Sequence, residues 1–532
     1  MHVVWLKRDL RLADHAPLHA ALDAADDGDG LLLLYVAEPE RQAQPDVSDL
    51  HLAWDLANAR ALLQAVDQRG GTMRIEVGDA VDVLDRLNNV EPIHTIQSHE
   101  ETGLMWSWNR DRRVLQWCTE HGIPWTEHAA NGVVRRLKNR DRWNGMRNRR
   151  MAADALPAPV ALPPPQKLES VDASPEWVPP YNTIVTTPLK PGEMEAHRWL
   201  DTFLDQRYTR YLPTISNPAT SPEGSSRLSA YIATGVLSVR QVVKAITATR
   251  LRANQLRAED RSVLAKNVNA FASRVSWRCH FVQRLEVETT MDTTAINPEL
   301  CTQLGRQDDD TRFQAWATGQ TGWPFFDACM RSLIATGWIN FRMRAMLQSV
   351  AAYTLNLPWQ RTGQHLAKLF IDYEPGIHWS QIHMQSGVTG INSVRAYSVT
   401  KQSLNHDMQG EFIRTWVPEL AMVPTPYIHE PWTMSTEMQA AIGVSIGTTY
   451  PTPIVDESEA RTKGIAAAYA AKRNEQVNAR SAAVYTKHGS RKQRGRRPTS
   501  RRTTTAKPST TAQPVRPSLQ RSLLDFEGTH PR

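Results

Sequence analysis

Short apolar runs alternate with amphipathic stretches over the first quarter of the chain. Residues 3–6 and 31–36 are continuous apolar runs, and shorter ones follow at residues 73–77 and 93–96. Residues 52–66, closed by a Gly-Gly pair, and residues 106–118 carry apolar side chains at helical spacing. Apolar strands separated by helices predict a parallel, doubly wound sheet with helices on both faces. We therefore expect an α/β domain over residues 1–135.

Changes of composition divide the rest of the chain. Residues 136–195 are rich in Pro, Arg and Ala, which is typical of a linker that crosses between domains. From residue 196 to 471 the apolar residues recur at helical spacing, which predicts an all-α domain. From residue 472 to 532 Lys, Arg, Ser and Thr dominate. That composition buries too little apolar surface to fold alone, so it predicts a basic disordered tail.

The net charge, the apolar runs and the cysteine content exclude several classes of protein. The net charge is +7 and the isoelectric point about 9.2, with much of the excess in the tail. Such a balance suits a polyanionic partner. No apolar run reaches the length of a membrane span and the charged start lacks the features of a secretory signal, so we expect a cytoplasmic protein without a membrane segment. The 4 cysteines form no Cys-x-x-Cys pair and predict neither a metal site nor a disulfide framework.

The most specific patterns lie in the helical part. Residues 319–331 read Gly-Gln-Thr-Gly-Trp-Pro-Phe-Phe-Asp-Ala-Cys-Met-Arg, and residues 336–344 read Thr-Gly-Trp-Ile-Asn-Phe-Arg-Met-Arg. Near the start, residues 5–14 read Trp-Leu-Lys-Arg-Asp-Leu-Arg-Leu-Ala-Asp. Together these segments resemble the photolyase/cryptochrome family. The resemblance spans roughly residues 1–470 and implies an α/β antenna domain followed by an all-helical FAD-binding domain.

The resemblance also implies where FAD binds. Residues 224–229, Gly-Ser-Ser-Arg-Leu-Ser, provide small donors before a predicted helix, which suits an anion, and they resemble the family's phosphate-binding motif. Arg344 and Asp372 match a pair beside the flavin ring, although a purely structural ion pair is the alternative. The complete set implied for the cofactor is Tyr211, Ser225, Ser226, Arg227, Leu228, Ser229, Arg278, Trp338, Phe341, Arg344, Asp372, Glu374 and His378.

Two of these positions depart from the family's usual residues. Glu374 stands where the family usually has an Asp near the pyrimidine edge of the flavin, so a carboxylate is kept. His378 falls where repair enzymes usually have an Asn that faces flavin N5. Since histidine can donate a hydrogen bond, we expect it to donate to N5. A histidine that is bonded within its own helix is the alternative.

The side that faces the substrate is altered more strongly. Trp277 and Arg278 match a Trp-Arg pair of the family, but Arg274 stands where dimer-repairing members usually have Glu. The change inverts the local charge, so Arg274 is expected to meet a phosphate or a base carbonyl instead. Met384 replaces a Trp that packs on the flipped dimer, and Phe341 and Ala345 replace the usual Asn and Met.

We assign four side chains to catalysis: Trp277, Arg274, His378 and Arg342. The paired histidines of the animal-type (6-4) enzymes are absent after Thr-Gly-Trp, where Asn340 and Phe341 stand, and this speaks against that subclass. The tryptophan chain that photoreduces the family's flavin is altered too. Trp359 is kept, but Ile382 holds the position next to the flavin. Trp359 and Trp379 are therefore the expected electron-transfer residues, with Trp323 and Tyr373 as possible additions to the route.

DNA binding is expected on cations near the cavity and in the tail. Arg342, Arg395 and Lys401 are the predicted DNA-facing side chains, although each alone is more often a solvated surface charge. The tail suits non-specific binding to phosphates, or simply confers solubility. Its last segment, from Gln520 to Phe526, resembles a short peptide that binds the bacterial sliding clamp, which gives a second candidate partner.

The resemblance leaves two principal functions open. The first is a deoxyribodipyrimidine photolyase, an enzyme that splits cyclobutane pyrimidine dimers in damaged DNA by electron transfer from FADH⁻. The alternative is a cryptochrome-like blue-light photoreceptor that binds FAD without repair, which the residues at positions 274, 378, 382 and 384 favour. A weaker reading is a flavoprotein acting on an unusual nucleic acid. An antenna chromophore (folate, deazaflavin or FMN) suits the first domain, and we expect a monomer.

Overall fold

A six-stranded parallel sheet organises the N-terminal part of the chain. The computed structural model describes residues 1–25 and 28–489. The strands are β1 (His2–Leu6), β2 (Leu31–Ala37), β3 (Thr72–Val77), β4 (Thr95–His99), β5 (Trp125–His128) and β6 (Val171–Asp172). They pair in parallel in the order β5-β4-β1-β2-β3-β6. The order reverses between β1 and β4, so the carboxyl ends of these two strands flank the crevice where such sheets commonly bind ligands.

Helices cover both faces of this sheet. The helices are α1 (Ala16–Ala24), α2 (Pro39–Gln42), α3 (Asp49–Asp67), α4 (Ala80–Val90) and α5 (Met105–His121). Leu33 of β2 belongs to the core that contains Trp54 of α3, whereas Leu34 belongs to the core that contains Val114 of α5. Successive strand residues point to opposite faces, so a strand buried on both faces must be apolar throughout, as β2 is. The predicted doubly wound α/β domain is confirmed.

The edges of the sheet were harder to predict than its centre. The apolar run at residues 93–96 predicts a strand there, but β4 begins two residues later and continues to His99. Its polar end is buried because neighbouring side chains satisfy it: Trp125 donates to Ser98 over 3.0 Å, and His128 bonds Gln97 over 2.8 Å. The short strands β5 and β6 carry no strong apolar signal and were missed.

The segment predicted as a linker contains structure of its own. It includes α6 (Trp143–Ala152), β6 and α7 (Tyr181–Ile184). Its irregular parts lie along the α/β domain, where Leu31 donates to the carbonyl of Pro163 and Leu162 to that of Arg69. Residue 30 must be glycine for this path, since a Cβ there would lie 2.1 Å from Cα of Pro165.

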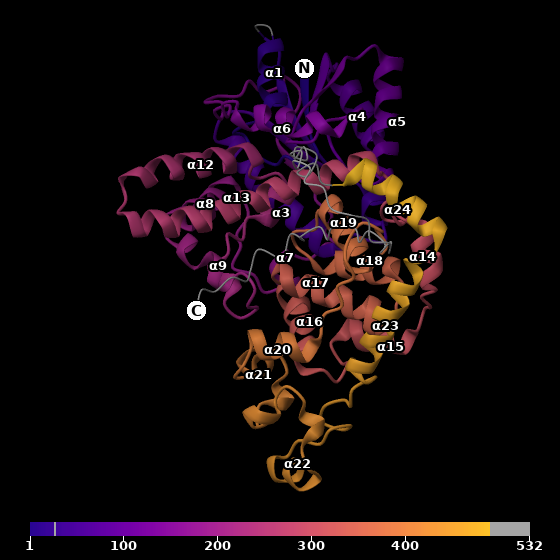
Figure 1. Ribbon diagram of the computed structural model, residues 1–532. Helices are drawn as coiled ribbons and strands as arrows, with labels where there is room; N and C mark the ends of the chain where they lie inside the picture. The colour runs from indigo at the N-terminus through magenta and orange to yellow at the C-terminus, as the bar shows by residue number, and fades with distance from the viewer. Residues whose placement is uncertain (26–27, 490–532) are drawn as a thin grey trace, which may run out of the picture.

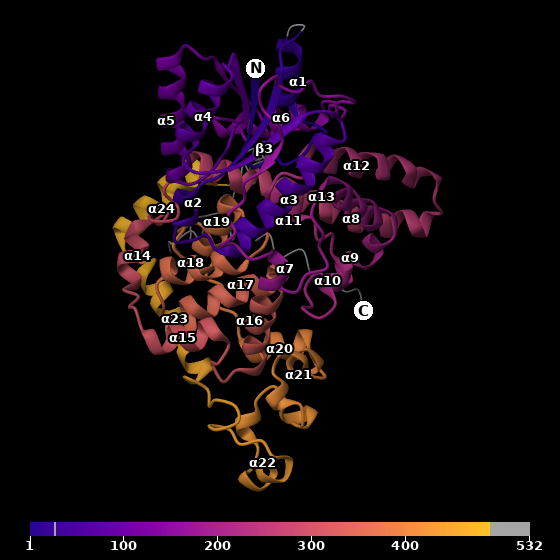
Figure 2. The same cartoon turned by 180° about the vertical axis from the view of Figure 1, so that it is seen from behind.

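The remaining described chain is helical, as predicted (Figure 1). Its longer helices are α8 (Glu193–Asp205), α12 (Val239–Arg252), α13 (Ala258–Val287), α14 (Pro298–Leu304), α15 (Asp310–Thr318), α16 (Pro324–Thr336), α17 (Phe341–Ser349), α18 (Trp359–Leu369), α19 (Pro375–Gln385), α20 (Val399–His406), α21 (Glu411–Trp416), α22 (Thr436–Ile442), α23 (Glu457–Ala471) and α24 (Glu475–His488). Three short ones are α9 (Tyr211–Thr214), α10 (Ser221–Gly224) and α11 (Ser229–Ala233). Figure 2 shows the α/β domain at one end of the molecule and α22 at the other.

The motif at residues 5–14 forms the joint between the two domains. Arg8 donates to the carbonyl of Ala233 over 3.0 Å, and Arg11 donates to that of Gly235 over 2.8 Å. Gly235 has a φ of 71°, and a Cβ there would lie 1.9 Å from the carbonyl oxygen of Arg8. Asp14 accepts from Ser238 and Arg240 at the start of α12. The motif that the resemblance places in the antenna domain thus docks that domain onto the helical one.

The predicted start of the disordered tail is wrong. Residues 475–488 form α24, which contacts α14 and buries Val477 and Val484. Lys487 and His488 both bond Glu288, the residue that follows α13, so polar contacts attach the helix as well as apolar ones. Residues 490–532, with the clamp-like peptide at 520–526, lie outside the described residues. Among the described helices, none combines the length and apolar character that crossing a membrane requires.

Candidate functional site

A cavity of about 320 Å³ opens between the loop before α11 and helices α13, α17 and α19. Its volume is within the range that small-molecule and cofactor sites occupy. The lining includes every residue named above for FAD and the four assigned to catalysis. Trp359, Trp379, Arg395 and Lys401 are not part of it. The fold therefore brings together residues from position 211 to position 385 around one space.

The segment before α11 carries buried donors that no other described residue satisfies. Arg227 is 5% exposed, and its Nε and Nη2 have no partner among the described residues. The hydroxyl of Ser225 is likewise buried and unpaired within the described chain. Unsatisfied buried donors cost free energy, and an anionic ligand rich in acceptors would satisfy them. These atoms fit the pyrophosphate of a dinucleotide such as FAD.

Local backbone geometry holds this segment in place. Arg227 has a φ of 57°, and its guanidinium lies 4.2 Å from the centre of the Trp338 ring. A Cβ on Gly224 would lie 2.0 Å from Oγ1 of Thr214, so only glycine fits there. Burial lowers the pKa of Arg227 to about 10, which still leaves it charged at neutral pH. Since α11 has only 5 residues, the side chains rather than a helix terminus account for anion binding.

Arg344 and Asp372 form a bidentate ion pair in the cavity wall. Nη1 and Nη2 of Arg344 lie 3.0 and 2.9 Å from the two carboxylate oxygens of Asp372. Burial opposes ionisation of Asp372, but the Arg344 guanidinium outweighs it and holds the pKa of that carboxyl below its usual value. The arginine is further fixed by a 2.7 Å hydrogen bond to the carbonyl of Ile339. The pair places a rigid cation beside the cavity, which suits a flavin ring that carries negative charge.

Glu374 connects both domains to the cavity. It accepts from Nη2 of Arg278 over 2.6 Å, and its other oxygen lies 3.6 Å from Arg8 of the α/β domain. Nη1 of Arg278 is buried without a partner in the described chain. The contact of Arg8 with Glu374 was not predicted, because nothing in the pattern around β1 indicates that Arg8 reaches the other domain.

His378 lines the cavity, but its hydrogen bonding does not match a donor to N5. Its Nε2 bonds the carbonyl of Gly363 over 2.8 Å, and a carbonyl only accepts, so the proton sits on Nε2. Burial lowers the pKa of His378 to about 4, which keeps the ring neutral. Nδ1 therefore carries a lone pair and can only accept. This tautomer therefore favours a ligand that donates a hydrogen bond to Nδ1.

Two half-buried residues of α13 form the part of the cavity assigned to the substrate. The guanidinium of Arg274 lies 4.7 Å from the centre of the Trp277 ring. Phe341, Arg342 and Ala345 of α17 line the same space, whereas Met384 does not. The cation thus lies against an aromatic face, an arrangement that can hold a nucleobase and a phosphate or carbonyl at once.

The two predicted electron-transfer residues lie behind the cavity wall. Trp359 and Trp379 are fully buried and their rings meet edge to face at 5.9 Å. Trp379 lies 5.1 Å from the ring of His378. It packs closely on α18 because residue 363 is glycine: a Cβ there would lie 2.6 Å from the indole.

Arg395 and Lys401 lie outside the cavity. Nε of Arg395 is 3.4 Å from Oγ of Ser393, and Lys401 is exposed in the first turn of α20. Their assignment to DNA therefore stays a prediction from sequence.

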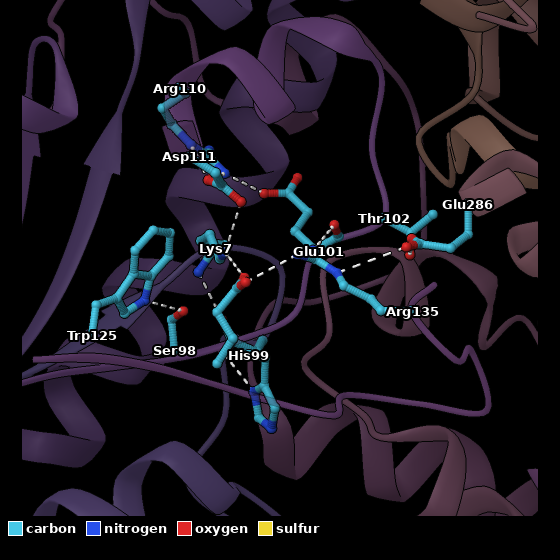
Figure 3. Close-up of polar contacts among 12 residues, drawn as sticks. Lys7, Ser98, His99, Glu101, Thr102, Arg110, Asp111, Trp125, Arg135 and Glu286 are labelled. Carbon is cyan, nitrogen blue, oxygen red and sulfur yellow. Dashed lines mark hydrogen bonds and ion pairs between the residues drawn. The ribbon is translucent and has the colours of Figure 1, made fainter. Parts of the chain in front are cut away.

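The crevice at the carboxyl ends of β1 and β4 is filled by ion pairs (Figure 3). Lys7 lies 3.3 Å from both Asp111 and Glu127, while Arg110 bonds Glu101 over 2.6 Å and Asp111 over 2.7 Å. A cavity of about 50 Å³ lies beside Glu101. A fused-ring chromophore needs several times that volume. No antenna chromophore is therefore assigned to this crevice, and its presence stays a prediction.

Comparison with known proteins gives a consistent result. Residues 2–140 match the family model for DNA photolyase, and residues 271–470 match that for the FAD-binding domain of DNA photolyase. The deoxyribodipyrimidine photo-lyase of Vibrio cholerae is 28% identical over 87% of this chain and 97% of its own. Cryptochrome DASH of Natronomonas pharaonis is 27% identical over 85% of this chain and 98% of its own.

Solved structures show the same architecture. A class III photolyase from Agrobacterium tumefaciens has a TM-score of 0.75 at 23% identity, covering 89% of this chain and 98% of that one. An archaeal photolyase from Sulfolobus tokodaii, solved with two FAD molecules, has a TM-score of 0.67 at 22% identity and covers 88% of this chain and 100% of that one. Both the antenna-type sheet domain and the helical domain are included in these matches.

Proposed function

The chain belongs to the photolyase/cryptochrome family, and from that premise we propose that it is a DNA photolyase, a carbon–carbon lyase that splits cyclobutane pyrimidine dimers under light. One observation carries the proposal: a single cavity is lined both by the residues that suit FAD and by Trp277, Arg274 and Arg342. A flipped dimer that entered from the α13 side would therefore lie next to the cofactor. Flipping costs least for a damaged, weakly stacked pair, which favours the lesion over intact DNA.

In the proposed reaction, some residues of the cavity supply charge and others supply its shape. Reduced FAD, when bound and excited, supplies one electron to the dimer and recovers it after the two ring bonds have broken. Arg344 and Arg278 hold negative charge in the cofactor part of the cavity, each oriented by a carboxylate. Arg274 lies over one face of the Trp277 ring, where it can meet a phosphate or a carbonyl, and a base would stack on the opposite face of the indole. Phe341 and Ala345 line the same cavity and add apolar surface to it.

A cryptochrome-like photoreceptor is the second candidate, and a specific observation favours it. Arg274 lines the cavity where dimer-repairing members usually have Glu, and Ile382 lines it in place of a tryptophan. A site with these residues could bind FAD and respond to light without binding a dimer productively.

One assay separates the two candidates. The FAD-loaded protein, with its flavin chemically reduced, is illuminated with DNA that carries cyclobutane dimers, beside a dark control and a (6-4) substrate. Light-dependent loss of cyclobutane dimers supports the photolyase. Photoreduction of bound FAD with no repair of either lesion supports the photoreceptor and rejects our proposal.

A further inference from the structure

Tyr373 separates two cavities. It stands between Asp372 and Glu374, and it lines both the 320 Å³ cofactor cavity and the 50 Å³ cavity between the domains. Its neighbours on either side anchor the cofactor cavity through Arg344 and Arg278. The ring is therefore held beside the space for the flavin, while its hydroxyl belongs to a different environment.

The hydroxyl of Tyr373 is bonded on both sides. It donates to Oδ2 of Asp46, in the loop between α2 and α3, and it accepts from Nε1 of Trp379 over 3.1 Å. Since the indole can only donate, the phenolic proton must point at Asp46. Trp379 thus acts as a positioning residue that fixes the direction of the proton.

The ring of Tyr373 lies between two neutral histidines. It stacks on His51 at 5.3 Å and meets His378 edge to face at 5.2 Å. Burial lowers the pKa of His51 to about 3 and that of His378 to about 4, so neither adds positive charge beside the phenol. Two neutral rings do not oppose removal of an electron from the phenol as two imidazolium cations would.

The surroundings of Asp46 suit a carboxylate that takes up a proton and holds it. Its side chain is 2% exposed, and Oδ1 has no partner among the described residues. Asp46 lines the smaller cavity together with Arg8, Arg41 and His51. A cavity of about 50 Å³ is large enough to hold water, which can hydrogen-bond to Oδ1 of Asp46 while Oδ2 holds the phenolic proton.

We propose that Tyr373 and Asp46 form a redox pair that reduces the oxidised flavin under light. One electron leaves the phenol of Tyr373 for the excited isoalloxazine ring, and the phenolic proton moves to Oδ2 of Asp46. This leaves a neutral phenoxyl radical and a protonated carboxyl. A thiolate from solution then returns one electron to the phenoxyl oxygen, which recovers its proton from Asp46. After two such turns the two thiyl radicals combine to one disulfide, and the flavin has gained two electrons from the thiolates and takes one proton from solvent.

Tyr373 is suited to donate an electron because its hydroxyl is bonded to a base, Asp46, that can take the proton. An oxidised phenol that keeps its proton is a strong acid, so electron loss is favourable only where an acceptor takes the proton. Asp46 is the only carboxylate among the described residues that accepts from this hydroxyl. The ring nitrogen of Trp359 has no hydrogen-bond partner among the described residues, that of Trp379 donates to the Tyr373 hydroxyl itself, and neither indole lines the cofactor cavity. The proposal rests on FAD binding and does not depend on DNA repair.

Two variants and one matched control test the pair. Tyr373→Phe removes the proton and Asp46→Asn removes the base. Tyr450→Phe is the control, because the hydroxyl of Tyr450 also donates to a buried carboxylate, that of Asp327, but lies away from the cofactor cavity. Each protein is loaded with oxidised FAD and illuminated anaerobically with excess thiol and without DNA. The rate of flavin reduction is then followed by absorbance and expressed per bound FAD.

We expect the rate to fall at least tenfold in Tyr373→Phe and Asp46→Asn and to stay at the wild-type value in Tyr450→Phe. In wild type frozen under light without thiol, the electron paramagnetic resonance spectrum should change when the protein carries ring-deuterated tyrosine. A wild-type rate in Tyr373→Phe, or a radical spectrum that responds only to deuterated tryptophan, would overturn the proposal. If the Phe variant fails to retain FAD, the wild-type spectrum decides alone. Absence of dimer repair would leave this result unaffected.

Discussion

Arg8, two residues beyond β1, lies 3.6 Å from the carboxylate of Glu374, so a cation of the α/β domain pairs with a residue that lines the cofactor cavity. The same carboxylate accepts a 2.6 Å hydrogen bond from Arg278. Two cations from different domains thus share one buried anion. The stability of the whole chain should therefore depend on this carboxylate more than on an ordinary surface ion pair.

Replacing Glu374 by Gln should lower the free energy of unfolding by about 1.5–3 kcal/mol, the value of a hydrogen bond to a charged group. The substitution keeps the shape and removes the charge that faces Arg278. Urea unfolding followed by circular dichroism measures the change. Glu419→Gln is the control, since Glu419 pairs with Arg331 over 2.7 Å and does not line the cavity. Equal losses in the two variants would contradict a special role for Glu374.

Replacing Asp372 by Asn should weaken FAD binding at least tenfold, or about 1.4 kcal/mol. Arg344 would lose its bidentate partner and the orientation it gives, and would no longer present a fixed cation to the ligand. Titration of the apoprotein with FAD, followed by flavin fluorescence, gives the dissociation constant. Asp308→Asn serves as the control, because Asp308 forms an exposed pair with Arg361. An unchanged constant in Asp372→Asn would show that the pair is purely structural.

Arg274 should decide how the cavity meets DNA. If it contacts a phosphate or a carbonyl of the substrate, Arg274→Ala should weaken binding of dimer-containing DNA by about tenfold and leave FAD binding unchanged. Gel shift with damaged and intact duplexes measures this. Arg274→Glu restores the residue usual in dimer-repairing members. Dimer repair by Arg274→Glu but not by the native protein would indicate that the native chain is not a dimer photolyase.

The sequence predicted the centre of each domain better than its borders. The β2 strand was placed correctly because every one of its residues is apolar and buried. The polar end of β4 could not be placed, since partners distant in sequence, such as His128, make its burial possible. The start of the tail was misjudged because α24 is held by a few contacts, with Glu288 above all, that composition does not reveal.

The cofactor cavity was predicted from family motifs, and its residues do line one space. The motifs do not indicate which partner of a hydrogen bond donates and which accepts. His378 was expected to donate, yet its bond to the carbonyl of Gly363 fixes the other tautomer. The contact between Tyr373 and Asp46 joins positions 327 residues apart and has no local signal.

Stability should fall as the pH drops below 6.5, because buried neutral histidines exclude protons that the unfolded chain binds. Burial, with Arg41 nearby, lowers the pKa of His51 from its ordinary 6.5 to about 3. Its contribution is complete above pH 6.5 and is lost progressively toward pH 3. One such histidine changes the free energy of unfolding by up to about 1.4 kcal/mol per pH unit in that window.

The variant His51→Gln tests this. Glutamine can still donate to the carbonyl of Phe370, which His51 bonds over 3.0 Å, but it does not titrate. Between pH 4.5 and 7.5, the free energy of unfolding measured in urea should rise with pH less steeply in the variant than in wild type. The difference in slope should correspond to about one proton. His94→Gln, at a side chain that is 50% exposed, is the matched control. A slope unchanged by His51→Gln would mean that this ring binds its proton equally well in the folded and the unfolded state.

The basic tail should carry much of the non-specific affinity for DNA. Residues 490–516 contain nine Lys and Arg and no Asp or Glu, whereas the whole chain has a net charge of only +7. A chain ending at residue 489 should therefore bind intact duplex at least tenfold more weakly at low salt. It should also show a shallower dependence of log affinity on log salt, because each lost phosphate contact removes about 0.9 from the slope.

A chain ending at residue 516 is the control: it removes the clamp-like segment from Gln520 to Phe526 but no net charge, so its salt slope should match that of the full chain. If both truncations keep the full slope, the phosphate contacts must come from the folded part, and Arg342, Arg395 and Lys401 become the residues to replace.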